Sequence, residues 1–389
     1  MSAKGTAVSV VSAPPPPPAV AEPIAALLRD QVISARVAPA ACAGHASELG
    51  PVALGAAGSL PGGVAVSTST IFDLASVSKP IVACTLARLV ERGLLELSAP
   101  LGSLLPQLGR TRSAGVPLEL LLSHRAGLDG HRALFAPVLQ GRPFRRLEAL
   151  VMAADARRAD CVGEPPLQGF APLYSDLGYA LLGACIEAVT HEPLDYVIER
   201  EVAVPLGLEL GSARLWLRKR PSFAHDVAPT EVVPARGGCL RGVVHDENAW
   251  ALSGHACSGH AGLFGTVRDV LGFGAALLAA HAGRSTWLSQ SSLQGLVRAR
   301  PGGTLRAGFD GKSEGASSAG SLAGPLTFGH LGFTGTSLWC DPGAGIAYVL
   351  LTNRVHPTRD NPRIRAARPL VHDGLFRAAT ALLPGAPNP

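Results

Sequence analysis

The strongest constraint on the fold is a run of apolar and β-branched residues near the C-terminus, Ile346 to Thr352. Seven such residues without a charge or a turn former predict a buried strand. Residues 52–66 are small, apolar and broken by glycine, which predicts a strand hairpin. The 389 residues suffice for one large domain or two ordinary ones, and 47% hydrophobic residues allow a sizeable core.

Helical patterns lie near both ends of the chain. After Glu22, apolar residues recur at helical spacing over residues 24–32. A last helix is expected from 363 to 383, interrupted near Pro369. A further helix is expected after Thr266, which begins a capping-box pattern with Asp in place of the usual Glu.

The two termini are expected to lie outside the folded domain. Residues 1–21 contain the run Pro14 to Pro18, which predicts an extended, disordered tail. Residues 384–389 form a short second tail. The folded domain is therefore expected over residues 22–383.

Charge, hydropathy and cysteine pattern narrow the partners. The net charge is +5, but no Lys/Arg run forms a stripe, so no nucleic-acid partner is expected. No apolar stretch is long enough to span a bilayer, and residues 5–13 make a poor signal core. We expect a cytoplasmic protein; periplasmic export stays open, because Ala- and Val-rich signals can be this weak. Seven scattered cysteines without a Cys-x-x-Cys pair predict reduced thiols.

A nucleophile motif opens the clearest helix. Ser76-Val77-Ser78-Lys79 lies where a helix begins, and Gly93 is expected to stop that helix. Positions i and i+3 share a helix face, so Lys79 can reach the Ser76 hydroxyl and act as its base. Lysine occurs only four times among 34 basic residues, and unlike arginine it can lose its proton when buried. The alternative is a chance Ser-x-x-Lys match.

A second motif, Tyr174-Ser175-Asp176, precedes another helix. A Tyr174 phenol near the Lys79 ammonium can be held as a phenolate or carry a proton to a leaving group. The alternative is a half-buried tyrosine followed by Asp176 as the helix N-cap.

A third motif runs from His330 to Thr336, just before the buried strand. Small residues such as Gly332 would let a substrate lie along a strand edge next to His330. The backbone N–H of Phe333 could join that of Ser76 in an oxyanion hole. The alternative is a glycine-rich hairpin turn with an incidental histidine.

Together, in this order, the three motifs resemble those of the serine β-lactamase and penicillin-binding-protein superfamily. The class C-like β-lactamase-related hydrolases are the most similar branch. The resemblance covers about residues 22–380. It extends to several further segments, which are 72–80, 121–128, 228–231, 241–249, 259–264 and 351–354.

The resemblance implies an α/β plus α fold. An antiparallel sheet, built from the N-terminal hairpin and the C-terminal strands, would be flanked by the terminal helices. A mostly helical subdomain would be inserted at about residues 90–300. The active site would lie between these parts.

The resemblance also implies acyl-enzyme chemistry on a small ester, amide or peptide substrate. No metal or organic cofactor is expected. The same site could serve an acyltransferase or a β-lactamase. A rival from another class is a non-catalytic protein that binds penicillin or peptidoglycan fragments. The sequence fixes neither the substrate nor the oligomeric state.

Three departures from the family pattern bear on the substrate. Asp176 stands where class C enzymes have Asn, His330 where β-lactamases have Lys, and Leu331 where most have Thr. A neutral histidine is a weaker anchor for a carboxylate than lysine. The departures favour esterase, D-aminoacyl amidase or carboxypeptidase-like chemistry over β-lactam hydrolysis.

The histidine-rich segments have a plainer interpretation than a metal site. His245-Asp246, His255 and His260 lie in glycine-rich stretches without a helical i, i+4 pair. We expect a structural loop that lines the site, with His245 and Asp246 hydrogen-bonding the loop backbone.

Overall fold

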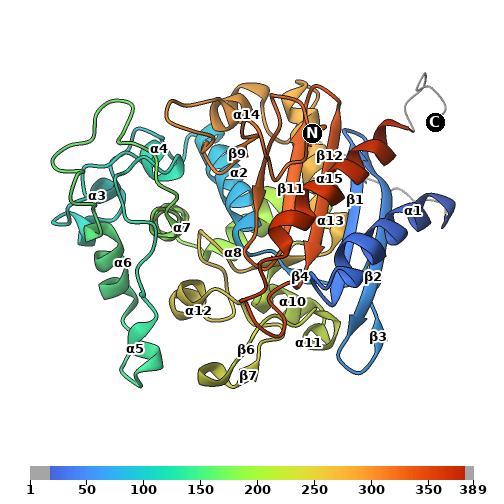
Figure 1. The fold of residues 1–389 in the computed structure, drawn as a ribbon. Coiled ribbons are helices and arrows are strands. Elements are labelled where there is room, and N and C mark those ends of the chain that lie inside the picture. Colours follow the sequence, from blue (N-terminus) through green and yellow to red (C-terminus); the bar gives the residue numbers. More distant parts are fainter. Residues whose placement is uncertain (1–17, 382–389) are drawn as a thin grey trace, which may run out of the picture.

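Seven antiparallel strands form one sheet in the spatial order β3-β2-β1-β12-β11-β10-β9. The computed structural model describes residues 18–381, with side chains from residue 22. The sheet therefore joins the two ends of the chain, as expected (Figure 1). Its strands are β1 Ala40–Ser47, β2 Gly50–Leu60, β3 Val64–Ala65, β9 Asp310–Gly311, β10 Phe328–Leu331, β11 Ser337–Asp341 and β12 Ile346–Thr352.

The predicted C-terminal strand is β12, with the expected bounds and all seven residues buried. It lies between β1 and β11, so its backbone is paired on both sides. Val349 and Leu351 pack into the core on one face, whereas Tyr348 and Leu350 pack into the core on the other. A strand covered on both faces needs an uninterrupted apolar run rather than an alternating one.

Helices cover both faces of the sheet (Figure 1). α13 (Val267–His281) packs on one face, and α1 (Pro18–Leu28) and α15 (Ile364–Thr380) pack on the other. The expected capping box is present, because Thr266 and Asp269 each accept a backbone N–H from the other. This cap fixes where α13 begins and thereby its position on the sheet.

Two details differ from the expected terminal elements. α15 continues through Pro369 without an interruption, so that prediction was wrong. Its buried face, with Val371, Leu375 and Ala379, packs against the sheet, and this burial outweighs the local cost of proline. α1 begins at Pro18, inside the segment expected as a tail. Residues 1–17 and 382–389 lie outside the described residues.

The middle of the chain is mostly helical and lies beside the sheet (Figure 1). Within the range expected for the helical insertion, α13 instead belongs to the cover of the sheet. The helices here are α3 Leu101–Leu104, α4 Leu118–Leu122, α5 Ala136–Leu139, α6 Arg146–Asp155, α7 Asp176–Thr190, α8 Leu194–Ile198, α9 Val204–Leu206, α10 Ala213–Lys219, α11 Phe223–Asp226, α12 Glu247–Ser253 and α14 Gln290–Val297. Short strands connect them, namely β4 Phe72–Asp73, β5 Gly211–Ser212, β6 Val232–Val233, β7 Gly238–Cys239 and β8 Leu263–Gly265.

α2 (Ser78–Glu91) lies between the sheet and the helical part, and eleven of its fourteen residues are buried. The sequence shows a single apolar face, but the structure covers this helix nearly all round. α2 ends as expected, with Gly93 in the left-handed region at φ +68°. A helix enclosed in this way holds its first turn, which carries Lys79, in place, and Ser76 lies in the 3-10 turn Ala75–Val77 that leads directly into it.

Within residues 18–381, no helix has both the length and the apolar character needed to cross a bilayer. All seven cysteines are free thiols, and only Cys239 is exposed. The cytoplasmic location stays a prediction.

His372 ties α15 to the sheet and gives a pH-dependent stability. Its Nδ1 donates to the Ser318 carbonyl at 2.6 Å, and its Nε2 accepts from the Ser337 hydroxyl at 2.9 Å. Both contacts fit a neutral ring, and burial lowers the pKa of His372 to about 3. Below about pH 6.5, His372 is therefore protonated in the unfolded chain but stays neutral in the folded protein.

We predict that the free energy of unfolding falls as the pH drops from 6 to 5. His372 alone should add a slope of about 1.4 kcal/mol per pH unit. Urea unfolding at several pH values checks this, with His372→Gln as the comparison. The variant should be less stable at pH 7 and show a shallower slope; an equal slope would contradict the assignment.

Candidate active site

The backbone turn before Ser76 is held by a buried carboxylate. Ala75 has φ +48°, a region that costs a non-glycine residue free energy and persists only where neighbours enforce it. Asp73, at the end of β4, accepts the N–H groups of Ala75 at 2.8 Å and His245 at 2.7 Å. Asp73 therefore fixes the turn that presents Ser76. Its role was not recognised in the sequence, because it acts through backbone groups that only the fold brings together.

Lys79 is fully buried beneath Ser76 and has three oxygen partners. Its Nζ lies 2.9 Å from Ser76 Oγ, 3.1 Å from the His260 carbonyl and 2.7 Å from Asp176 Oδ1. Ser76 Oγ and the His260 carbonyl accept hydrogen bonds from Lys79, and Asp176 forms an ion pair with it, so these surroundings match the charged ammonium. The expected Ser76–Lys79 contact is present in the structure.

The ion pair sets the charge state of Lys79. Burial lowers the pKa of Lys79, but the Asp176 carboxylate and Tyr174 raise it more, so the net shift is upward. For Asp176, burial raises the pKa and Lys79 lowers it, and the net shift is downward. At neutral pH the pair is therefore ammonium and carboxylate. In this state Lys79 cannot accept the Ser76 proton until it loses one of its own.

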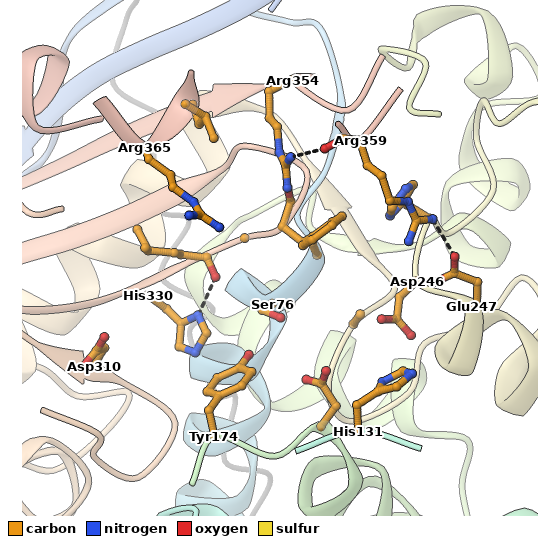
Figure 2. Close-up of a pocket in the computed structure, with 18 of the residues that line it drawn as sticks. Ser76, His131, Tyr174, Asp246, Glu247, Asp310, His330, Arg354, Arg359 and Arg365 are labelled. Atoms are coloured by element: carbon orange, nitrogen blue, oxygen red, sulfur yellow. Dashed lines mark hydrogen bonds and ion pairs between the residues drawn. The ribbon is translucent and has the colours of Figure 1, made fainter. Parts of the chain in front are cut away.

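Tyr174 completes the group around the nucleophile. Figure 2 shows its hydroxyl end pointing toward Ser76, and the Lys79 Nζ lies 4.9 Å from its ring centroid. The His124 ring packs against it at 4.7 Å between centroids, and His124 Nδ1 accepts the Ser175 N–H at 3.0 Å. Burial and the Asp176 charge raise the pKa of Tyr174, whereas Lys79 lowers it; the net shift is upward, so the resting phenol is neutral.

Asp176 is not the N-cap of its helix. Ser175 occupies that position without a side-chain cap bond, and Asp176 is the first residue of α7. Its carboxylate instead faces Lys79 and the cavity. The helix start and the ion pair both favour its ionised form.

His330, on β10, is a neutral histidine. Its Nδ1 donates to the Leu331 carbonyl at 2.7 Å, so the proton lies on Nδ1, and Nε2 is an acceptor without a hydrogen-bond partner in the described part of the chain. Burial and the nearby Lys79 charge lower the pKa of His330 to about 3. It therefore carries no charge with which to bind a carboxylate.

The turn after His330 is joined to the turn before Ser76 by two hydroxyls. Thr334 donates to the Asp73 carbonyl at 2.8 Å, and Thr336 donates to the Leu74 carbonyl at 2.9 Å. A Cβ on Gly332 would lie 2.6 Å from the Leu74 carbonyl oxygen, so only glycine fits this approach. The third motif is thus held against the nucleophile segment.

Phe333 shapes the outer part of this turn. Its ring stacks on His245 at 5.7 Å, and the Arg354 guanidinium lies 4.4 Å from its centroid. Within residues 18–381 its backbone N–H donates no hydrogen bond, so it is free to serve an oxyanion. Arg354 itself donates to the Phe333 and Arg359 carbonyls.

A cavity of about 850 Å³ opens above Ser76 (Figure 2). The predicted site residues line it except for Lys79, which lies beneath, and they are Ser76, Tyr174, Asp176, His330, Gly332 and Phe333. Four arginines that were not among the predicted site residues also line it, namely Arg354, Arg359, Arg365 and Arg368. They follow β12 or lie on α15, and their spacing alone gives no signal of a shared wall.

The four arginines differ in how many partners their side chains have, and Arg359 is paired with Glu231 and Glu247. Buried Arg368 donates to the Gly332 and Thr336 carbonyls, and Arg354 is bound to main-chain carbonyls. The exposed Arg365 guanidinium has no hydrogen-bond or ion-pair partner among residues 18–381, and Figure 2 shows it reaching into the cavity above His330. Arg365 is therefore the cation most available to a ligand.

The histidine-rich segments act as supports around the cavity. The His245 ring pairs with Glu231 at 3.0 Å, and its backbone N–H bonds Asp73, so the expected role for the His245 side chain was wrong. Asp246 does bond the loop backbone, at the Ala249 N–H, and also contacts His260 Nε2 at 2.8 Å. In the described part of the chain, no three His, Cys, Asp or Glu side chains are arranged to hold a metal ion.

Comparisons with known proteins identify relatives along most of the chain. A putative D-alanyl-D-alanine carboxypeptidase of Salmonella agona is 28% identical over 346 residues, covering 82% of this chain and 76% of the relative. The D-amino acid amidase from Ochrobactrum anthropi matches in structure with TM-score 0.66 and 20% identity, over 93% of this chain and 99% of the other. EstCE1, a hydrolase with promiscuous acyltransferase activity, matches with TM-score 0.66 and 23% identity, over 91% and 98%.

The two structural matches establish a shared fold. The model of the Beta-lactamase family matches residues 30–372. This range contains all strands of the sheet and every residue that lines the cavity. The chain belongs to the beta-lactamase family of serine hydrolases.

Proposed function

We propose that this serine hydrolase cleaves a small ester or amide through an acyl-enzyme on Ser76. The observation that carries the proposal is the contact between Ser76 Oγ and the buried Lys79 at the foot of an open cavity. A hydroxyl so placed can attack a carbonyl once a neighbouring base takes its proton. The neutral His330 and the free Arg365 suggest an esterase, a D-aminoacyl amidase or a carboxypeptidase-like enzyme.

The proposed reaction has two halves. In the form of the enzyme whose Lys79 is a free amine, Ser76 Oγ attacks the carbonyl carbon and Lys79 takes its proton. That proton then passes by way of Tyr174 to the leaving oxygen or nitrogen as the bond to the acyl carbon breaks. The N–H groups of Ser76 and Phe333 stabilise the oxyanion. Water then attacks the acyl-enzyme, gives up a proton to the same groups and releases the acid with Ser76 restored.

A carboxypeptidase-like substrate has specific support. A peptide that is cut near its C-terminus places a carboxylate beyond the scissile bond. Arg365 offers a fork of N–H donors suited to a carboxylate. The Salmonella relative carries the name of such an enzyme at 28% identity.

We predict that a fluorophosphonate forms its adduct on Ser76. Peptide mapping by mass spectrometry after labelling checks this, and Ser76→Ala should take up no label. An adduct on another residue, or no adduct with any acyl probe, would contradict the proposal.

We predict that Asp176→Asn shifts the pH profile of kcat/KM toward lower pH. The Asp176 charge raises the pKa of Lys79, so the free amine forms only at alkaline pH in the wild type. Removing an opposite charge at this distance lowers that pKa by roughly one to three units. The profile with p-nitrophenyl butyrate from pH 6 to 10 checks this. If kcat/KM of the variant rises at the same alkaline pH as that of the wild type, Lys79 is not the titrating group.

We predict that p-nitrophenyl butyrate is a better substrate than nitrocefin, a β-lactam with a carboxylate beside its ring. His330→Lys should raise kcat/KM for nitrocefin relative to the ester by roughly one to two decades, because it adds a charge-assisted contact. Arg365→Gln should lower cleavage of a D-alanyl dipeptide more than that of the ester. A wild-type preference for nitrocefin would mean that the enzyme is a β-lactamase.

A further inference from the structure

The segment 245–248 has no role in the reaction described above, yet it contacts several walls of the cavity. The His245 ring stacks on Phe333, next to the oxyanion turn. Asp246 contacts His260, whose carbonyl accepts from Lys79. One short segment therefore supports both the oxyanion turn and the lysine.

The next two residues reach the remaining walls. Glu247 pairs with Arg359 at 2.5 Å. Asn248, only 1% exposed, donates from Nδ2 to the Arg132 carbonyl at 2.8 Å and accepts at Oδ1 the Phe135 N–H at 3.2 Å. A buried side-chain amide whose nitrogen donates to a backbone segment and whose oxygen accepts from it holds that segment in one position.

The segment that Asn248 holds forms a wall of the cavity. His131 and Phe135 both line the cavity, and Figure 2 shows His131 on the side of Ser76 away from Arg365. This stretch is irregular until α5 begins. In the described part of the chain, residues 131–135 make hydrogen bonds to a distant segment only through Asn248. The buried side chain of Leu134 is the apolar contact of this stretch with the core.

We propose that Asn248 is a positioning residue that sets the size of the substrate group accepted on the Phe135 side of Ser76. This inference rests on the proposed hydrolase function. With Asn248 in place, the Phe135 ring closes that end of the cavity and limits the length of an apolar chain there. Without its two hydrogen bonds the wall moves outward, and longer groups fit.

The test compares p-nitrophenyl acetate, butyrate and octanoate in the wild type, Asn248→Ala, Phe135→Ala and the double variant. Both single variants should raise the octanoate-to-acetate ratio of kcat/KM by about tenfold, mainly by lowering KM for octanoate. The double variant should show no further rise, because both changes act on one wall.

Two controls separate positioning from mere stability. His372→Gln removes contacts to Ser318 and Ser337 rather than to residues 131–135, and it should keep the wild-type ratio. Hydrogen exchange of amides 131–139 should be faster in Asn248→Ala than in the wild type. An unchanged ratio, or exchange equal to wild type, would overturn the inference.

The proposed function can fail separately from this inference. If no ester is cleaved and Ser76 takes up no label, the hydrolase proposal falls. The exchange measurement still decides whether Asn248 holds the wall, because it needs no turnover.

Discussion

The site depends on one buried charge. Lys79 can lie buried beneath Ser76 only because Asp176 supplies the opposite charge and because two further oxygens accept hydrogen bonds from its ammonium group. A lone ammonium would be strongly disfavoured there. The ion pair also has a chemical consequence, since it keeps the lysine protonated at rest. The carboxylate that stabilises this pocket thus opposes the first proton transfer, and an Asn at this position would relieve that opposition.

Much of the fold could be predicted because its signals are local. The uninterrupted run of β12, the capping box of α13 and the glycine after α2 each have one physical interpretation. Local reasoning failed where tertiary burial decides the outcome. Pro369 looks like a helix break, yet the packing of α15 on the sheet keeps the helix continuous.

The candidate site divides in the same way. Ser76, Lys79 and Tyr174 could be found because short spacings and motif order specify them. The arginines that line the cavity could not be predicted, because only the path of the chain after β12 brings Arg354 and Arg365 to the same cavity as Ser76. Asp73 and Asn248 act through distant backbone groups, which no spacing in the sequence reveals.

Arg368 connects the last helix to the chemistry. This residue is 9% exposed, and its guanidinium donates to the Gly332 and Thr336 carbonyls in the turn that meets the Ser76 segment. Ser76 is synthesised long before α15, the helix that braces the oxyanion turn. A partly synthesised chain therefore carries its serine without the complete site, and hydrolysis has to wait until α15 has left the ribosome and packed on the sheet.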